Sequence, residues 1–368
     1  MNKLLILVAM VALISCADAK TAASSDEVAT FEQAASARHE AGELNGIVLV
    51  ARGDEVLFRD AFGMADPVSG RELTIGTQSR IASVTKQFTA AAILMLAEEN
   101  RLSLDDTIGS HLPGYPEPAA SRITIRQMLN HSSGLARPEQ ETARETPQTA
   151  TQDRLNVFAS LPLDFEPGSE HDYSNSGYIV LGAIIEKVTN ESFPVALQRL
   201  LFDPIGLDHT SAAFDDANVP GLASDLRRSS GRLVEDDYRL SDRGAPFSAG
   251  MLVSTVDDLA KWTRALHGGE VFEEPSSYQL MLTTPGGWEE NRAFDQWAYA
   301  SGLFQARRDN GREFIFHDGR LGSYLSDLRY YPALDVTIVV LETAGGDVTS
   351  TADALENVAF ARFEPTEN

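Results

Sequence analysis

The pattern of hydrophobic positions first shows two strand-like runs, at residues 46–52 and 55–62. Both runs are rich in Val, Leu and Phe or Ile, and the dipeptide Gly53-Asp54 between them is typical of a tight turn. We therefore predict a β-hairpin at this place. Further strands are predicted near the other end of the chain, at 303–307, 313–317, 325–331 and 336–341.

Helices are predicted over most of the remaining chain, at 21–43, 83–100, 123–129, 178–188 and 351–363. The segment 83–100 is apolar nearly all round, which is typical of a helix buried on all sides. Residues 101–245 show no strong set of strand signals, and loops with Pro and Gly interrupt them.

Strands at both ends of the chain with helices between them predict an α+β fold. We expect one antiparallel β-sheet, built from both chain ends and flanked by helices, with an inserted all-helical region at about 100–245. Hydrophobic residues make up 43% of the chain and charged residues 23%, as in ordinary globular proteins. Residues 25–368 are expected to form a single domain.

The net charge narrows the range of partners. The chain carries a formal charge of −24 at pH 7, whereas binding to nucleic acid or to anionic membranes relies on clustered Lys and Arg. Neither partner is expected. No second apolar run long enough for a membrane span follows the N-terminus, so we expect no transmembrane helix.

Residues 1–19 have the pattern of an export signal. Lys3 provides the charged start, residues 4–14 the apolar stretch, and small residues follow. Two cleavage sites are compatible with this pattern. Ala17-Asp18-Ala19 is an A-x-A site, while residues 13–16 resemble a lipobox that ends in Cys16, the only cysteine of the chain. We expect a periplasmic protein or a lipoprotein anchored through Cys16, with secretion as the alternative.

Ser83 and Lys86 are the first candidate catalytic residues. Side chains at i and i+3 share a helix face, so the amine of Lys86 is expected within reach of the Ser83 hydroxyl. Serine attacks a carbonyl when a neighbouring base takes its proton, and a desolvated lysine can be that base. An arginine would stay charged and could not be this base. Because Arg is much more frequent than Lys in this chain, a Lys at position 86 indicates that a titratable amine is needed there. The alternative is a helix-capping Ser followed by a solvated Lys.

Two further segments carry candidate chemistry. Tyr173 and Asn175 precede a predicted helix, and beside an activated serine the phenol can pass a proton while the amide holds a substrate carbonyl. His317 ends a predicted strand, and Asp318 and Gly319 follow it. Asp-Gly is also an ordinary hairpin signal, so a simple turn is the alternative there. In the functional interpretation the glycine lets the backbone approach a ligand, and His317 supplies a proton or a positive charge.

The order of these motifs, Ser-x-x-Lys, then Tyr-Ser-Asn, then His-x-Gly, resembles the serine β-lactamase and penicillin-recognising hydrolase family. The likeness is strongest to its class C-like branch of D,D-peptidases, D-aminopeptidases and esterases, and it extends from about residue 30 to the end. Further blocks that resemble the family in the same order lie at 80–88, 102–106, 125–135, 181–186, 203–207 and 249–262.

The resemblance implies roles for residues at the matching positions. Ser83 would be the nucleophile, Lys86 its base or proton relay, Tyr173 the second proton-transfer residue and Asn175 the amide that orients the substrate. His317 stands where many members have lysine.

The resemblance also implies an oxyanion hole made by the backbone N–H groups of Ser83 and Arg320, beside Gly319. No cofactor and no metal are expected, since the seven histidines show no paired ligand spacing. The substrate would be a small ester, amide or peptide.

One departure from the family pattern concerns the substrate. Members that cleave β-lactams commonly have Thr or Ser between the His or Lys and the Gly, where its hydroxyl helps bind the carboxylate of the drug. This chain has Asp318, which would repel a carboxylate unless it points away or Arg320 compensates. The change favours peptidase and esterase activity over β-lactam cleavage.

For several other residues we expect a structural role or a contact with the pocket rather than a catalytic role. His131 is expected to order a loop through hydrogen bonds rather than to catalyse. Trp288, Trp297 and Tyr299 are compatible with cleft lining or with packing. Loops at 136–160 and 220–245 are expected to shape the pocket.

The predicted function is therefore an exported serine hydrolase that forms an acyl-enzyme on Ser83 and cleaves carboxylic esters or small D-amino-acid or peptide amides. Two alternatives stay open: a β-lactamase, and a penicillin-binding or scaffold-like relative that is acylated without turnover.

Overall fold

The computed structural model describes residues 29–137, 151–156, 158–213, 219–236, 247–291 and 295–364. The predicted export signal, Cys16 and the first residues of the predicted helix 21–43 lie outside these ranges. Parts of the two predicted pocket loops also lie outside them. Among the described residues, the helices are all too short or too polar to cross a bilayer.

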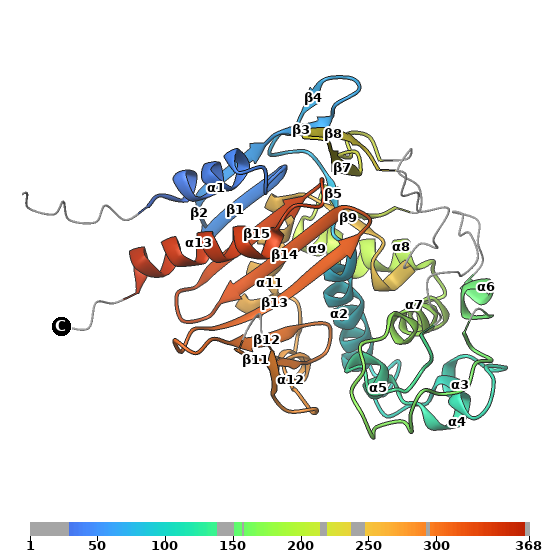
Figure 1. The fold of residues 1–368 in the computed structure, drawn as a ribbon. Coiled ribbons are helices and arrows are strands. Elements are labelled where there is room, and N and C mark those ends of the chain that lie inside the picture. Colours follow the sequence, from blue (N-terminus) through green and yellow to red (C-terminus); the bar gives the residue numbers. More distant parts are fainter. Residues whose placement is uncertain are drawn as a thin grey trace, which may run out of the picture.

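An eight-stranded antiparallel sheet forms the centre of the fold, in the order β10-β11-β12-β13-β14-β15-β1-β2 (Figure 1). Its strands are β1 (Gly46–Arg52), β2 (Glu55–Phe62), β10 (Glu289–Asn291), β11 (Asp295–Tyr299), β12 (Phe304–Arg307), β13 (Glu313–Leu321), β14 (Tyr324–Tyr331) and β15 (Val336–Glu342). Strand β1 pairs with β15 along its whole length. The prediction of one sheet built from both chain ends is confirmed.

The predicted strands agree with this sheet except at its far edge. The hairpin β1–β2 has the predicted bounds, and β14 and β15 differ from them by one residue. Strand β13 continues to Leu321, four residues beyond the predicted end. Strands β10 and β11 were not predicted, because they begin with the polar sequences Glu-Glu-Asn and Asp-Gln, which carry no apolar pattern.

Helices cover both faces of the sheet (Figure 1). Helices α1 (Phe31–Glu40) and α13 (Val348–Phe363) pack on one face, over Val48, Val50 and Ile338. On the opposite face, Leu49 and Val339 belong to the larger core, which includes α11 (Val256–Gly268) and α2 (Thr85–Glu98). Successive residues of a strand point to opposite faces, so β1 and β15 are apolar at almost every position because both of their faces are buried.

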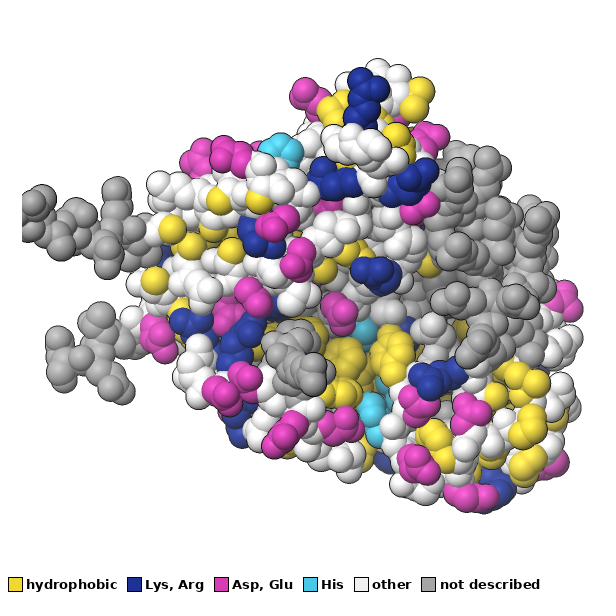
Figure 2. Space-filling model, viewed as in Figure 1, with side chains coloured by type: hydrophobic (Ala, Val, Ile, Leu, Met, Phe, Trp, Pro, Cys, Tyr) yellow, Lys and Arg dark blue, Asp and Glu magenta, His cyan; other side chains and the backbone are white. Residues whose placement is uncertain are grey.

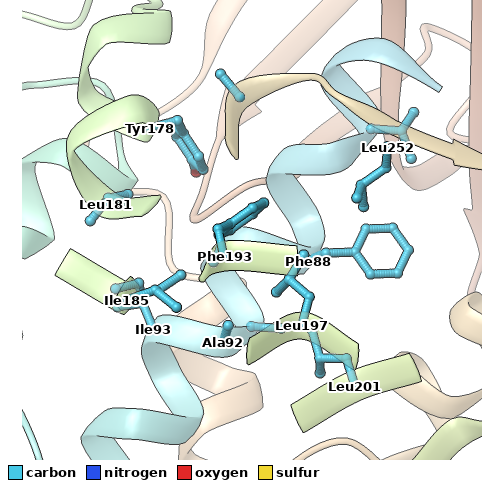
Figure 3. Packing of buried hydrophobic residues seen from close by; sticks show 14 of the residues in the cluster. Phe88, Ala92, Ile93, Tyr178, Leu181, Ile185, Phe193, Leu197, Leu201 and Leu252 are labelled. Carbon is cyan, nitrogen blue, oxygen red and sulfur yellow. The ribbon is translucent and has the colours of Figure 1, made fainter. Parts of the chain in front are cut away.

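Helix α2 lies between the sheet and the helical part of the chain. Nearly all its side chains are buried, as the sequence predicted from its apolar circumference. Its Phe88 and Ile93 share one core with Tyr178 and Ile185 of α7 (Asn175–Thr189) (Figure 3). This packing brings the start of α2 beside the start of α7, where the Ser-x-x-Lys and Tyr-Ser-Asn motifs lie.

The region between α2 and α11 is mainly helical but not entirely so. The helices in the described part of this region are α3 (Ile108–His111), α4 (Ala119–Arg122), α5 (Ile125–Leu129), α6 (Thr151–Asn156), α7, α8 (Phe193–Leu197), the π-helix η2 (Gln198–Phe202), α9 (Asp203–Ile205) and the 3₁₀-helix η4 (Phe247–Ala249). It also contains β6 (Ser211–Ala212) and the hairpin β7 (Leu226–Ser229) and β8 (Arg232–Glu235). The expectation that residues 101–245 lack strands is therefore wrong, because these strands are too short to show a pattern. The single catalytic domain and the subdomain bounds remain predictions.

A second, three-stranded sheet supports the start of α2. It pairs β5 (Ser79–Arg80) with β9 (Leu252–Ser254), and β9 with β6. The backbone N–H of Ile81 donates to Leu252 O at 3.0 Å, which holds the chain in place directly before Ser83. The other elements are β3 (Met64–Asp66), β4 (Arg71–Glu72), the 3₁₀-helix η1 (Ala82–Val84) and α12 (Pro275–Met281).

Candidate active site

Ser83 lies in η1, the short 3₁₀-helix that leads into α2. The preceding Ala82 has φ +45, in the left-handed region that residues with a Cβ rarely adopt. Two contacts hold this turn: Val84 N–H and the Ser326 hydroxyl both donate to Ile81 O, at 3.1 and 2.8 Å. Strain of this kind persists where surrounding structure enforces it, and it is frequent at active sites. Ser83 is partly exposed, so a substrate can reach it.

Lys86 lies one turn after Ser83, on the same side of the helix. Its Nζ is 3.2 Å from Ser83 Oγ, 2.8 Å from Asn175 Oδ1 and 2.7 Å from Ala249 O. The predicted reach from the amine to the hydroxyl is present in the structure. The contact to Asn175 joins the first two motifs.

These three contacts fit a neutral amine. The oxygens of Asn175 and Ala249 only accept, so they take two N–H bonds of Lys86. A neutral amine then has one lone pair left, and the remaining partner is the Ser83 hydroxyl, which can donate to it. Burial lowers the pKa of Lys86 well below its usual value, while the Asp318 carboxylate acts in the opposite direction. Lys86 can therefore accept the proton of Ser83.

Tyr173 lies next to this pair, two residues before α7. Its side chain hydrogen-bonds to that of Ser83, and Lys86 Nζ is 4.8 Å from the centre of its ring. Burial raises the pKa of Tyr173, its side-chain hydrogen bond with Ser83 lowers it, and Asp318 raises it further. Tyr173 is therefore a protonated phenol at neutral pH, suited to donate a proton rather than to act as a phenolate.

His131 holds the loop that carries Tyr173. Its Nδ1 accepts the backbone N–H of Ser174 at 3.1 Å, and its carbonyl oxygen accepts the N–H of Asp172 at 2.9 Å. Its ring is 4.3 Å from the ring of Tyr173, centre to centre. The prediction that His131 orders a loop is confirmed. Burial and then the charge of Lys86 lower the pKa of His131 well below its usual value, so the ring is neutral.

The third motif lies inside strand β13, and this corrects the alternative of a turn after a strand that ends at His317. Asp318 pairs with Asp327 of β14 and Gly319 with Ser326. A Cβ on Gly319 would come within 2.6 Å of Ile81 O and 2.9 Å of Ala82 Cβ. The glycine therefore lets the strand approach the turn that holds Ser83, because no side chain fits between them.

His317 points toward Tyr173, with ring centres 6.3 Å apart. Its Nδ1 lies 2.6 Å from the carbonyl oxygen of Asp318 and must donate to it, since a carbonyl only accepts. Burial is the main cause that lowers the pKa of His317 to about 3, and Lys86 lowers it as well when its amine is protonated. The ring is therefore neutral with an unprotonated Nε2, which is buried and has no hydrogen-bond partner among the residues that the structure describes. This environment contradicts the expectation that His317 supplies a positive charge.

Asp318 and Arg320 lie on the other face of β13 from His317 and are exposed. Partial enclosure by the protein raises the pKa of Asp318, while Arg329 and Lys86 oppose this. Strand β12 pairs with β13 only as far as Phe316. Among the described strands, none covers the following residues on that side, and Gly319, next to Arg320, lies against Ile81 and Ala82 of the Ser83 turn. The oxyanion hole of Ser83 and Arg320 remains a prediction that this arrangement favours.

The aromatic residues near β11 differ in their roles. Tyr299 is buried within the site, 4.3 Å from His131 and 6.0 Å from His317 between ring centres. Trp297 is partly exposed and packs on Phe304. Trp288 is exposed, and Arg307 lies 4.9 Å from the centre of its ring.

Figure 2 shows a hollow between the sheet and the helical part, in which hydrophobic and histidine side chains gather.

The structure brings together Ser83, Lys86, Tyr173 and Asn175 as the sequence predicted. It also adds a residue whose role was not predicted, Ala249, whose carbonyl oxygen fixes the amine of Lys86. Its segment was noted only as a block that resembles the family, because a backbone acceptor leaves no signal in residue type. Among the described residues, no group of three or more His, Cys, Asp or Glu side chains is placed to hold a metal ion.

Comparisons with known proteins show the family and the fold of the chain. The family model described as "Beta-lactamase" matches residues 31–363. Protein flp of Staphylococcus aureus (strain NCTC 8325 / PS 47) is 30% identical over 308 residues, which cover 80% of this chain and 58% of flp. The chain thus spans little more than half the length of this relative.

Two solved structures share the fold. The penicillin-binding protein from Bacillus halodurans superposes with a TM-score of 0.78 at 24% identity, over 88% of this chain and 98% of that one. The D-amino acid amidase from Ochrobactrum anthropi SV3 gives a TM-score of 0.75 at 21% identity, over 90% of this chain and 99% of that one. Because the family model covers nearly the whole described chain, we conclude that this protein belongs to the beta-lactamase family, whose members are serine hydrolases.

Proposed function

We propose that the protein is an exported serine hydrolase that forms an acyl-enzyme on Ser83 and cleaves carboxylic esters or small D-amino-acid or peptide amides. The observation that carries the proposal is the buried Lys86 Nζ at 3.2 Å from Ser83 Oγ. When the amine is neutral and its two N–H groups donate to Asn175 Oδ1 and Ala249 O, its lone pair is available to the Ser83 hydroxyl. A binding module has no need of such an amine.

Acylation begins when Ser83 Oγ attacks the substrate carbonyl and its proton passes to Lys86 Nζ. The carbonyl oxygen becomes an oxyanion, which the backbone N–H groups of Ser83 and Arg320 would stabilise. Donors of this kind are worth about 2.7 to 4 kcal/mol in comparable sites. The positive end of α2 also favours negative charge at Ser83.

Collapse of this intermediate breaks the bond to the leaving group. Tyr173, a neutral phenol beside Ser83, donates its proton to the leaving oxygen or nitrogen and recovers it from Lys86. The acyl group then stays on Ser83 Oγ as an ester.

Deacylation uses the same groups in reverse. A water molecule attacks the acyl carbonyl and gives a proton to Tyr173 while the phenol passes its own proton to Lys86 Nζ. That proton then moves from Lys86 to Ser83 Oγ as the ester bond breaks. Asn175 is exposed at the cleft, and while its oxygen accepts from Lys86, its NH₂ group would donate to the substrate. His317 Nε2 offers a second, acceptor contact to the bound molecule.

Measurement of product release from candidate substrates tests this proposal. The mature protein and its Ser83→Ala variant are incubated with a carboxylic ester, a D-amino-acid amide, a D-Ala-D-Ala peptide and a chromogenic cephalosporin. We expect release of product from the ester or an amide by the wild type and none by the variant. A stable acyl adduct without turnover would instead assign the protein to the penicillin-binding class, and no reaction with any compound would contradict the proposal.

Export and a lipid anchor are part of the proposal and rest on residues 1–19 alone. Growth of cells with a labelled fatty acid tests the anchor. We expect label on the wild type and none on Cys16→Ser. Unlabelled, exported wild-type protein would assign cleavage after Ala19.

A further inference from the structure

Partly exposed aromatic side chains lie beside the catalytic centre without a role in the chemistry described above. Phe304 of β12 has its ring 5.0 Å from that of His317, 4.6 Å from that of Tyr299 and 5.3 Å from that of Trp297, centre to centre. Its ring is nearly parallel to that of Tyr173, at 9° and 6.4 Å. Phe304 therefore connects the catalytic phenol to Trp297.

The strand geometry places these rings in one row. Trp297 and Tyr299 are two residues apart on β11 and thus point to the same face, and Tyr299 pairs with Phe304 across the ladder. Tyr299 is buried, but Trp297 and Phe304 keep part of their surface open. Apolar surface that stays open next to reactive groups is typical of a ligand site rather than of a packed core.

A second observation points to a ligand at the same place. His317 is 1% exposed, and within the described part of the chain its Nε2 has no hydrogen-bond partner. A buried acceptor without a donor is costly, unless a bound molecule supplies one. The ring that carries this atom contacts both Phe304 and Tyr299.

We propose that Trp297, Tyr299 and Phe304 form an aromatic subsite that binds an aromatic or bulky apolar group of the substrate beside Ser83. This inference rests on the proposed hydrolase function and specifies its substrate class. The enzyme then prefers esters or amides with such a group over those that carry only methyl groups. The subsite selects substrates by apolar contact and takes no part in proton transfer.

The test compares three methyl or benzyl esters by acid release: methyl acetate, methyl 3-phenylpropanoate and benzyl acetate. Methyl acetate is the small reference, and the other two place a ring on the acyl side or on the alcohol side. We expect wild-type kcat/KM to be about tenfold or more higher for at least one ring-bearing ester, since apolar pockets discriminate at this level. The side with the preference shows which half of the substrate occupies the subsite.

Variants assign the preference to the named residues. Trp297→Ala and Phe304→Ala are each expected to reduce the ratio of ring-bearing to methyl kcat/KM to within about threefold of unity. Trp288→Ala is the matched control. Glu289 pairs with Trp297, and Trp288 is the residue before Glu289, so Trp288 lies on the opposite face of the sheet from Trp297. The ratio of ring-bearing to methyl kcat/KM should therefore not change in Trp288→Ala. Phe304→Leu serves as a second variant if Phe304→Ala does not fold.

The outcomes separate the two proposals. A wild type that cleaves methyl acetate without preferring either ring-bearing ester contradicts the subsite but not the hydrolase function. An unchanged ratio in folded Trp297→Ala and Phe304→Leu also contradicts the subsite, as does an equal loss in Trp288→Ala. A wild type that cleaves none of the esters or the amides contradicts both proposals.

Discussion

The Nζ atom of Lys86 lies 2.7 Å from the carbonyl oxygen of Ala249. This backbone oxygen can only accept, and with Asn175 Oδ1 it takes both N–H bonds of a neutral amine. The lone pair is then left for Ser83. A residue outside the three sequence motifs thus orients the base, and it does so with an atom that no substitution of its side chain removes.

Replacement of Lys86 by Arg tests the need for a neutral amine. The guanidinium stays charged at all accessible pH values, so it cannot accept the proton of Ser83. We expect kcat/KM for ester cleavage to fall by about 10² to 10⁴, the usual contribution of a general base. Lys261→Arg is the matched control, because Lys261 is exposed and donates to Gly206 O. Turnover close to wild type in Lys86→Arg would refute the assigned role.

The acid limb of the pH–rate profile should report the protonation of Lys86. Activity needs the neutral amine, so it rises as pH increases through the lowered pKa of Lys86. The Asp318 carboxylate raises that pKa, and Asp318→Asn is therefore expected to move the acid limb to lower pH. Measurement of kcat/KM against pH for one neutral ester checks the direction.

The control for this shift is Asp335→Asn, in the turn after β14 at the far end of the strand from Ser326. Asp335 has φ +53, a conformation that Asn tolerates well. Its acid limb should coincide with that of the wild type. A shift to higher pH, or no shift, in Asp318→Asn would contradict the assignment of the acid limb to Lys86.

The variant Tyr173→Phe tests whether Tyr173 donates a proton to the leaving group or helps Ser83 to attack. Amide nitrogen leaves poorly without a proton, whereas p-nitrophenolate leaves well without one. We therefore expect the variant to lose about 10² or more in kcat for a D-amino-acid amide and clearly less for a p-nitrophenyl ester. An equal loss for both substrates would show that Tyr173 mainly activates Ser83.

His131→Ala should leave the backbone N–H of Ser174 without its acceptor. An unpaired buried donor costs about 1–3 kcal/mol, so thermal unfolding shifts to lower temperature. Because Tyr173 is held by the same loop, kcat should fall more than KM changes. His131→Asn is the conservative variant, since its Oδ1 can replace Nδ1 as acceptor and Asn accepts φ +58. Recovery of stability without recovery of kcat would contradict the positioning role.

Asp318 should disfavour substrates that carry a carboxylate near β13. We expect slow turnover of a cephalosporin relative to a neutral ester, and a higher relative rate in Asp318→Thr, which removes the negative charge and adds a hydroxyl. Steady-state rates on both substrates give the comparison. Cephalosporin turnover as fast as ester cleavage in the wild type would show that Asp318 does not act on the bound substrate.

The sequence predicted those parts of the molecule that depend on local pattern. The apolar runs identified β1, β2, β14 and β15, and the i, i+3 spacing identified the pair Ser83 and Lys86, which stays within reach although Ser83 lies in a 3₁₀ turn rather than in α2. The continuation of β13 through Asp318 was missed, since Asp-Gly is ambiguous between a turn and a strand next to a close backbone contact.

Contacts between distant segments could not be predicted in this way. The carbonyl of Ala249 reaches Lys86 from 163 positions along the chain, and the ring of His131 reaches Ser174 across 43. The neutral state of His317 depends on its burial and on Lys86, neither of which its neighbours in sequence reveal. Residue types identified candidate site residues, but their charge states depend on burial and on neighbours that only the fold brings together.

The most direct measurement is the mass of the protein trapped during reaction with an ester and then digested and mapped. The account predicts one added acyl group, on the peptide that contains Ser83, and its absence in Ser83→Ala. An acyl group on another residue, or undiminished ester cleavage by Ser83→Ala, would contradict the account.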